Sequence, residues 1–534
     1  MTLLLASFAS AAMAQEDAHV HCASIGWVPQ EILVRPVPLR AATGNSADVV
    51  TSASDEARAY YLQGLNYLHG YAWIEGARSF NQAIRLDPGF AMAHWGLSRI
   101  YSGLDDHENA VIQAKRASEL GKAATPREQR RIALRLQQLD AIADLDNAAL
   151  HAAYKQAIDR ALVADIGDVE LWLIRGNAEE PTAAGRGQRG GVASTAFYQE
   201  ALRAAADNGA AHHYLTHSYE NFNQIARALG HGEVYARIAS AIPHAHHMWG
   251  HDLRRVGRLD EAIAAFNRTN DLEKAYYAAE KIPAEMDWHH VHNLDLLATS
   301  YEHKGQMRRA EALLREAAAV KPITEYQAYN QKSLTVFLLG RQRWREALAG
   351  ATALSKSNSP GTRVIGHAFA GHAYLGLRDP KAAHRELAAA EAEMSEVPAL
   401  VAGIGVGRGV VAPYVDALRA EILLREGKLG EGGALMKEVQ AKLRALPGPD
   451  AWTQALFRLE AFARIARDVG DWELAEFTAL QMIDHDAAYG GSHLALALVA
   501  SHRGDLEVAQ RESDAARRYW KDADPDLKEL AQLR

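Results

Sequence analysis

Two pairs of histidines, each four residues apart, recur one structural unit apart in this sequence. "NGAAHHYLTHSYEN" (208–221) holds His213 and His217, and "IPHAHHMWGHDLRR" (242–255) holds His247 and His251. Residues four apart lie on one face of a helix, about 6 Å from each other. Neighbouring helices pack about 8–10 Å apart, so two such pairs can face each other. The spacing therefore predicts one shared imidazole site, and a transition metal is the first interpretation because imidazole suits copper, zinc and iron better than magnesium or calcium.

The sequence around these pairs is rich in histidine. Eleven of the 24 histidines fall between residues 212 and 292. Glu220 lies seven residues after His213 on the same helix face, where it can act as an oxygen ligand, a base or the acceptor that orients a histidine. A polar, partly protonated groove that binds an anionic partner is the alternative interpretation of the same histidines.

Other sequence features exclude several function classes. The 534-residue chain has a formal net charge of -8 and no basic stripe, so no nucleic-acid partner is expected. A single cysteine excludes an intramolecular disulfide and a zinc site built from several thiolates. The sequence also lacks the H-E-x-x-H, G-x-S-x-G, P-loop and C-x-x-C-H motifs, so standard hydrolase and cytochrome chemistry is not expected.

The elements that position the histidines are helices arranged in repeats. Alanine and leucine are abundant and Pro totals only 16, which predicts an almost entirely helical chain. In "ARAYYLQGLNYLHGYAWIEGARSFNQAIRLDPGF" (57–90), Gly64 falls on a first helix, Phe80 falls on a second, and Pro88 follows it. This segment resembles a tetratricopeptide repeat (TPR), and similar turns such as "GRLDEA" and "GDWELA" recur along the chain. The resemblance implies an all-α, right-handed α-solenoid of TPR-like helical hairpins with a concave groove.

The repeat frame of this family adds two histidines to the predicted site. In that frame the two histidine pairs occupy the same first-helix positions, which face the concave groove in TPR proteins. His244 and His292 share a further position near the start of the next first helices, so they are expected as supplementary ligands. Six imidazoles exceed one tetrahedral site, and two adjacent three-histidine coppers, similar to type 3 copper proteins, are an interpretation that stays open. The six predicted metal ligands are His213, His217, His244, His247, His251 and His292.

The chain is predicted to contain five segments. They are a signal peptide (1–14), an extended arm (15–54), a TPR-like solenoid (55–396) with a histidine-rich segment (209–303), a Gly-rich loop (397–413) and C-terminal TPR-like repeats (414–534). The apolar start followed by small residues indicates export, and so predicts a periplasmic or secreted protein. No later apolar run approaches the roughly 20 residues that cross a bilayer. His19, His21 and Cys22 are interpreted as part of a disordered end, with copper binding as the alternative.

These features together predict an exported TPR solenoid with a histidine-ligated metal centre. Copper is the first choice of metal, and zinc or iron is the next. As an enzyme the protein would be a metal-dependent oxidoreductase or hydrolase, with Glu220 as its base and a peptide, protein or small molecule in the groove. The alternatives are a non-catalytic scaffold for protein–protein interaction and a metal storage or delivery protein.

Overall fold

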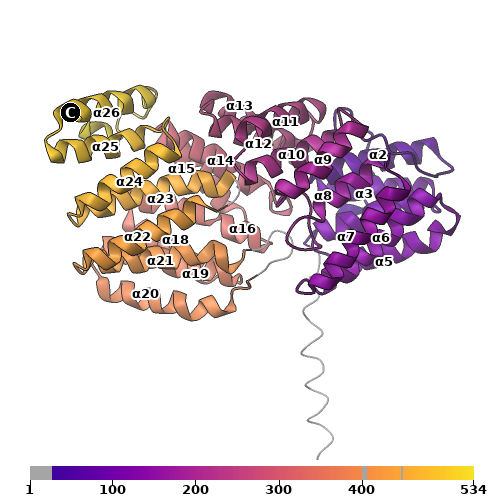
Figure 1. Cartoon of the computed structure of the whole chain (residues 1–534), viewed down its shortest axis with the longest axis horizontal. Helices are drawn as coiled ribbons and strands as arrows, with labels where there is room; N and C mark the ends of the chain where they lie inside the picture. Colours follow the sequence, from indigo (N-terminus) through magenta and orange to yellow (C-terminus); the bar gives the residue numbers. More distant parts are fainter. Residues whose placement is uncertain (1–26, 400–405, 447–448, 534) are drawn as a thin grey trace, which may run out of the picture. The chain divides into compact units, whose positions relative to one another are not determined.

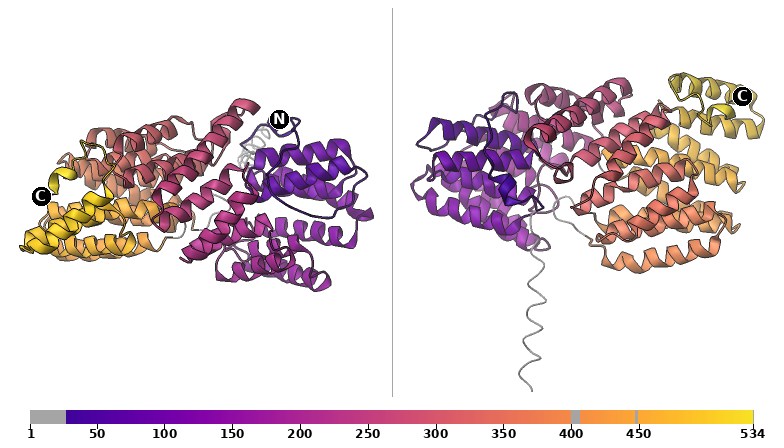
Figure 2. Two further views of the ribbon diagram at one scale, coloured as in Figure 1. Left: turned by 90° about the horizontal axis from the view of Figure 1, so that it is seen from above. Right: turned by 180° about the vertical axis from the view of Figure 1, so that it is seen from behind.

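The computed structural model describes residues 27–399, 406–446 and 449–533. The predicted signal peptide and the residues His19, His21 and Cys22 lie outside these ranges. Throughout the described residues the regular structure is helical and no strand forms (Figure 1). Consecutive helices pair into hairpins, as the two further views in Figure 2 also show. The predicted fold class, an all-α solenoid of TPR-like hairpins, is confirmed.

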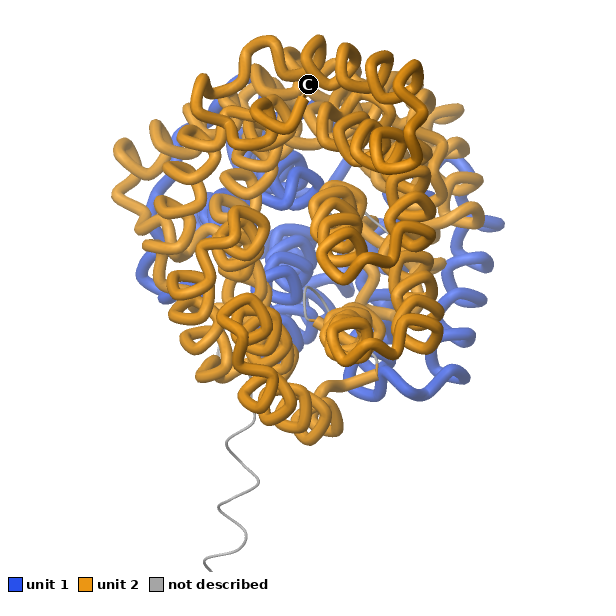
Figure 3. The backbone as a smooth tube through the Cα atoms, turned by 90° about the vertical axis from the view of Figure 1, so that its left-hand side faces the viewer, with its two compact units in different colours: residues 1–174 blue, residues 175–534 orange. Residues whose placement is uncertain are grey.

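The chain divides into two compact units, residues 1–174 and residues 175–534 (Figure 3). This division falls inside the segment that the sequence predicted to be one solenoid (55–396), at α8 (Val169–Asn177). The preceding helices are α1 (Gln30–Leu33), α2 (Asp55–His69), α3 (Trp73–Leu86), α4 (Ala91–Gly103), α5 (His107–Leu120), α6 (Pro126–Ala143) and α7 (Ala148–Ala164).

The second unit contains the histidine-rich segment and all later repeats. Its helices are α9 (Val192–Ala204), α10 (Gly209–Asn221), α11 (Ile225–Ile238), α12 (Pro243–Arg255), α13 (Leu259–Glu280), α14 (His290–His303), α15 (Met307–Ala319), α16 (Glu325–Asn330), α17 (Lys332–Gly340), α18 (Trp344–Leu354), α19 (Pro360–Gly376), α20 (Pro380–Glu393), α21 (Arg408–Arg425), α22 (Leu429–Arg444), α23 (Pro449–Asp468), α24 (Trp472–His485), α25 (Gly490–Arg503) and α26 (Leu506–Tyr519).

The hairpin of α2 and α3 shows why the repeat sequence folds in this way. Ser54 caps α2, because its side chain accepts a hydrogen bond from the backbone N–H of Ala57 at 3.1 Å. Phe80 of α3 is fully buried against Gly64 of α2, where a Cβ atom would come within 2.7 Å of its ring. A small residue at this position therefore lets the two helices approach closely.

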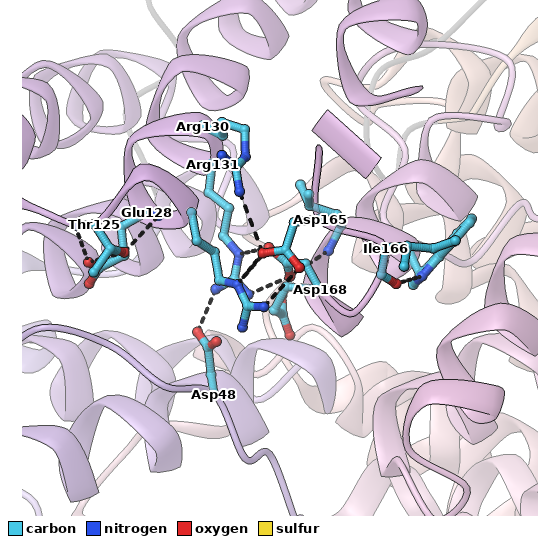
Figure 4. Close-up of polar contacts among 12 residues, drawn as sticks. Asp48, Thr125, Glu128, Arg130, Arg131, Asp165, Ile166 and Asp168 are labelled. Carbon is cyan, nitrogen blue, oxygen red and sulfur yellow. Dashed lines mark hydrogen bonds and ion pairs between the residues drawn. The ribbon is translucent and has the colours of Figure 1, made fainter. Parts of the chain in front are cut away.

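A buried ion network ties the first unit together (Figure 4). Nη2 of Arg131, on α6, lies 2.5 Å from a carboxylate oxygen of Asp168, and its Nη1 lies 2.6 Å from Asp48. Asp48 belongs to the segment before α2, so this ion pair joins the predicted arm to the hairpins. Asp48 also accepts a hydrogen bond from the hydroxyl of Tyr61 at 2.8 Å. The network thus places one buried guanidinium between two buried carboxylates.

Within the second unit, the C-terminal segment contacts helices from much earlier in the sequence. The indole Nε1 of Trp520 donates to the carbonyl oxygen of His303 at 3.2 Å, although the two residues are far apart in the sequence. Arg341, which follows α17, pairs with Glu529 at 2.6 Å. These contacts join the C-terminal segment to the helices that follow the histidine-rich segment.

Two glycine-rich stretches differ from the simple loops expected there. The stretch between α8 and α9 is anchored by Glu180, which is buried and accepts hydrogen bonds from the backbone of Arg186 and Gly187. The predicted loop at 397–413 is shorter than expected, because α21 begins at Arg408 and continues through Pro413. Pro413 lies inside this helix, where it has no backbone N–H to donate to the preceding turn. In the described part of the chain, no helix is both long and apolar enough to cross a membrane.

Candidate metal centre

The predicted histidines lie on α10, α12 and α14, the first helices of successive hairpins in the second unit. Asn208 caps α10 through a hydrogen bond from the backbone N–H of Ala211 at 2.8 Å, and Pro243 begins α12. Gly250 of α12 lies against Phe266 of α13, where a Cβ would come within 2.7 Å of the ring. This close packing fixes the face of α12 that carries its histidines.

The first histidine set consists of His213, His217 and His244, all buried. Nε2 of His213 lies 3.1 Å from Nε2 of His217 and 3.0 Å from Nε2 of His244. Three imidazole nitrogens from two helices therefore converge on one point. The ring of Tyr235 stacks on the ring of His213, with the two ring centroids 4.6 Å apart.

The second histidine set consists of His247, His251 and His292, also buried. Nε2 of His247 lies 2.7 Å from Nε2 of His251. The ring centroid of His292 lies 4.6 Å from that of His247 and 6.0 Å from that of His251. In each set, every histidine has a ring nitrogen that lies within 4.8 Å of a ring nitrogen of each of the other two histidines.

The two sets are built in the same way, one repeat apart. Each combines a pair of histidines four residues apart on one first helix with a histidine near the start of the next first helix. The first set uses α10 and α12, and the second uses α12 and α14. All six histidines singled out in the sequence are thus brought together, as two groups of three. The rings of His244 and His247 link the groups, with centroids 5.8 Å apart.

Polar neighbours fix the orientation of the second set. Nδ1 of His247 lies 2.9 Å from Oδ1 of Asn293, which is fully buried. Because an amide oxygen only accepts, Nδ1 of His247 carries the proton and Nε2 keeps its lone pair for a ligand. The hydroxyl of Tyr326 lies 3.4 Å from Nδ1 of His292. A hydrogen bond to the outer nitrogen is how metal-binding histidines are usually oriented.

Burial keeps these imidazoles neutral. It lowers the pKa of His217 to about 4, partly offset by the charge of Glu220. Burial also lowers the pKa of His244 and His247 well below the ordinary value, and the neighbouring histidines lower it further. Neutral imidazole is the form that binds metals, so the ligand form is the one this environment favours near neutral pH.

Glu220 faces the second set. Its Oε1 lies 3.6 Å from Nδ1 of His251, and the residue is 2% exposed. Burial, and next the negative charge of Glu220, raise the pKa of neighbouring Asp252 well above its ordinary value. Glu220 therefore lies near the outer nitrogen of His251 but beyond hydrogen-bond distance, and its role as ligand, base or orienting acceptor stays a prediction. It also borders a cavity of about 670 Å³ that is further lined by Arg255 and Trp452.

One histidine of the cluster was not among the predicted ligands. His289, just before α14, has its ring centroid 4.2 Å from that of His247 and 4.9 Å from that of His244. Its Nδ1 lies 2.6 Å from Glu273, and among the described residues its buried Nε2 has no hydrogen-bond partner. Burial would raise the pKa of Glu273. Hydrogen bonds from His289 and His290 contribute to an opposite and larger effect, and the pKa is lowered to about 2. His289 thus presents a nitrogen to both sets.

The remaining histidines of the segment have other partners. His212 and His231 contact each other through their Nδ1 atoms at 2.8 Å, and His246 contacts the carbonyl oxygen of Ser240 at 3.0 Å. His212 and His246 each precede a site residue by one position, His213 on α10 and His247 on α12, and contact different neighbours. They therefore offer matched controls for substitutions in the sets.

Comparisons with known proteins assign neither a family nor a function to this chain. No family model matches the chain, and no curated protein matches it. Similar solved structures include the APC/C hetero-tetramer Cut9–Hcn1 (10% identity, 90% of this chain and 97% of that chain, TM-score 0.32), yeast Tom70 (12%, 89% and 94%, 0.32) and a monomeric IFIT1 mutant with Gppp-AAAA (13%, 86% and 90%, 0.32). These scores are too low to support an argument, so the fold assignment rests on the hairpins of this chain.

Proposed function

We propose that this TPR-like protein holds a histidine-ligated dinuclear transition-metal centre, with copper as the first choice of metal. The observation that carries the proposal is the repetition of one three-histidine arrangement on successive hairpins. A chance cluster of histidines has no reason to repeat both the spacing of its pair and the position of its third member. One metal ion for each set gives the repetition a physical cause.

The distances inside the sets support a metal over hydrogen bonding alone. Nε2 of His213 is approached by two other Nε2 atoms at 3.1 and 3.0 Å. A neutral imidazole nitrogen offers either one hydrogen or one lone pair, so it cannot form two full hydrogen bonds of this kind. A metal about 2.0–2.1 Å from each nitrogen spaces its ligands roughly 3–3.5 Å apart and uses all three lone pairs at once.

The ligand set favours copper, with zinc or iron as the next candidates. Both sets contain imidazole nitrogens and no thiolate, and imidazole binds copper, zinc and iron well. Copper stands highest in the affinity order of divalent metals at such a site. Three protein ligands leave further coordination positions open, which is a property of catalytic rather than structural metal sites. A metal-dependent oxidoreductase is therefore the activity that we propose, with a hydrolase as the alternative.

The chain's own residues would prepare the site for this chemistry. Asn293 holds His247 with its Nε2 lone pair turned inward, and Glu220 stands behind His251. Glu220 lies between His251 and the cavity that it borders, so a peptide or small molecule bound in the cavity would contact Glu220. We expect Glu220 to accept a proton from a molecule bound in this cavity, which is the role of base predicted for it.

Two other functions remain candidates for specific reasons. TPR-like hairpins form scaffolds that bind peptides or proteins, and the cavity beside Glu220 is large enough for a side chain of a partner. A metal storage or delivery protein would use the same two sets without turnover. The export signal predicted from the sequence belongs to the proposal, because it would place the centre in the periplasm or outside the cell.

The proposal is tested by titrating metal-free protein with Cu²⁺ and Co²⁺ while recording visible and electron paramagnetic resonance spectra. We expect spectral changes that saturate at two equivalents and show nitrogen ligation. The double variant His213→Ala and His247→Ala should lose both signals, whereas the control His212→Ala and His246→Ala should keep them. Equal spectra for the two double variants would overturn the metal centre and favour the scaffold.

A further inference from the structure

A second buried cavity lies in the same unit and uses none of the histidines described above. It has a volume of about 50 Å³ and is lined by residues of α14, α17, α18, α19, α21 and α23. Its walls include the aromatic rings of Phe457, Phe462 and Trp344, together with Arg458 and His372. A cavity of this size has room only for a very small molecule, and its lining combines these apolar rings with charged side chains.

Arg458 is the unusual residue of this cavity. It is 6% exposed, and among the described residues its Nε and Nη2 atoms have no hydrogen-bond partner. Its guanidinium carbon lies 4.8 Å from the ring centroid of Tyr414, 5.4 Å from that of Phe369 and 5.5 Å from that of Phe462. Three aromatic faces stabilise the cation partly, but they supply no acceptor for its N–H groups. Leaving such donors buried and unsatisfied is costly.

The acidic residues around the cavity do not provide the missing partner. Glu421 is already engaged by Nδ1 of His372 at 2.5 Å and by Arg425 at 2.7 Å. Burial, and next the charge of Glu460, raise the pKa of Glu302 to about 8, so Glu302 is neutral near pH 7.

The remaining charged groups of the lining are also engaged elsewhere. Glu460 accepts a hydrogen bond from the hydroxyl of Tyr489 at 3.0 Å. Arg341 pairs with Glu529 at 2.6 Å, and Arg464 donates to the carbonyl oxygen of Gly340 at 2.9 Å. Asp468 also lines the cavity, at the end of α23. Arg458 therefore differs from the other arginines of this lining, because its Nε and Nη2 donors have no acceptor among the described residues.

We propose that this cavity binds a small monocarboxylate, with Arg458 as its principal ligand. The two unsatisfied donors of Arg458, Nε and Nη2, suit a carboxylate, because a planar guanidinium donates two parallel hydrogen bonds to such a group. Nε2 of His372 lines the same cavity, but it carries a lone pair while Nδ1 of the ring donates to Glu421, so Arg458 supplies the hydrogen bonds to the carboxylate. The apolar part of the molecule would lie against Phe457 and Phe462. A phosphate dianion is disfavoured, because it would bring two negative charges to a single guanidinium.

The test uses the full-length protein, with sodium acetate and sodium propionate as probes and sodium chloride and phosphate at equal ionic strength as references. Thermal unfolding and isothermal titration calorimetry measure binding. We expect a saturable increase in the melting temperature with the two carboxylates, a Kd near about 1 mM and no saturable effect of chloride. An equal response to chloride or phosphate, or no response to either carboxylate, overturns the proposal.

Variants separate binding from folding. Arg458→Met removes a buried cation with unsatisfied donors, so the metal-free, ligand-free variant should be at least as stable as wild type, and its Kd for propionate should rise at least about tenfold. Arg419→Met, at an exposed arginine of α21 that pairs with Asp416, is the control and should bind propionate as wild type does. If Arg458→Met does not fold, saturation-transfer NMR of propionate with wild-type protein tests the proposed site instead. A propionate signal that acetate displaces and chloride does not supports the site, and the lack of one contradicts it.

Discussion

Two buried polar regions of this chain, the Arg131 network and the two histidine sets, differ in how their polar groups are paired. In the first unit, Arg131 lies between Asp48 and Asp168, and all three side chains are nearly inaccessible. In the second unit, six buried imidazoles form two groups of three, and Glu220 lies 3.6 Å from the outer nitrogen of His251. The Arg131 network is complete without any other molecule. The histidine sets have ligand atoms aimed at a common point and no opposite charge at that point.

The difference separates a structural role from a binding role. Buried opposite charges that satisfy one another hold elements together, and their removal is felt as lost stability. Buried neutral imidazoles cost free energy unless something uses their lone pairs. We therefore expect changes in the Arg131 network to affect folding and changes in the histidine sets to affect metal binding. The predictions below test this contrast in order of decreasing effect.

The largest effect is expected for Arg131→Leu. This change leaves Asp48 and Asp168 buried without their cation, so the free energy of unfolding should fall by about 3–5 kcal/mol. Urea unfolding followed by circular dichroism measures the change. The exposed arginine of the same unit, Arg116→Leu, is the control and should cost less than about 1 kcal/mol. A similar small cost for both variants would show that the network is not a structural core.

Metal loading should stabilise the protein by a smaller amount. A ligand that binds only the folded state at one hundred times its Kd adds about 2.7 kcal/mol, so Cu²⁺ should raise the melting temperature. The double variant His213→Ala and His247→Ala should lose this increase, and Arg131→Leu should keep it if it folds. An increase that survives the double histidine change would mean that copper binds elsewhere.

The next effect concerns the residue that orients the second set. Asn293→Ala removes the acceptor for Nδ1–H of His247, and loss of such a contact typically weakens metal binding about 10–100-fold. Competition with a chromophoric chelator measures the affinity. Asn267→Ala, on the neighbouring α13, is the control because its amide donates to the backbone of Ile263. Identical affinities for the two variants would remove Asn293 from the site.

The smallest effect is a pH dependence that distinguishes neutral from paired carboxyl groups. The pKa of Glu302 is about 8 in the folded chain, above its ordinary value of 4.5. The folded state therefore holds an extra proton between these values, and its stability falls as the pH rises through this window. Glu302→Gln lacks this decline, so it should gain about 1 kcal/mol relative to wild type for each pH unit between about pH 6 and pH 8.

A paired carboxylate provides the control for this pH profile. Arg343 lies 2.7 Å from Glu311 and contributes to lowering its pKa, so Glu311 titrates below the tested window. Thermal unfolding across the pH range should show a constant difference between Glu311→Gln and wild type. A constant difference for Glu302→Gln as well would mean that Glu302 is already ionised near neutral pH.

Repetition in the sequence made most of the fold predictable. Small residues, large aromatic residues and turns at regular spacing identify the hairpins, as Gly64 and Phe80 illustrate. The division at α8 was not predicted, because it depends on which helices contact one another and not on local pattern. The early start of α21 was missed for a related reason, since glycines and Pro413 suggested a loop and packing of the helix overrode them.

Repetition also explains what was predicted of the site and what was missed. Helical spacing placed His213 and His217 on one face, and the repeat frame supplied His244. His289 was missed because it precedes the first residue of α14 and has no counterpart in the preceding repeat. Its partner Glu273 lies in the extra length of α13, which has 22 residues compared with 14 in α11. A contact between an elongated helix and a helix start leaves no periodic signal.

The most direct test of the account is the number of metal ions per chain, measured by plasma mass spectrometry on protein expressed with its own N-terminus. We expect two ions per chain in wild type and in His212→Ala. We expect one ion in His217→Ala and one in His251→Ala, and none in the double variant His217→Ala and His251→Ala. Wild-type protein that stays free of metal after reconstitution would contradict the account. So would a single ion that either His217→Ala or His251→Ala removes completely.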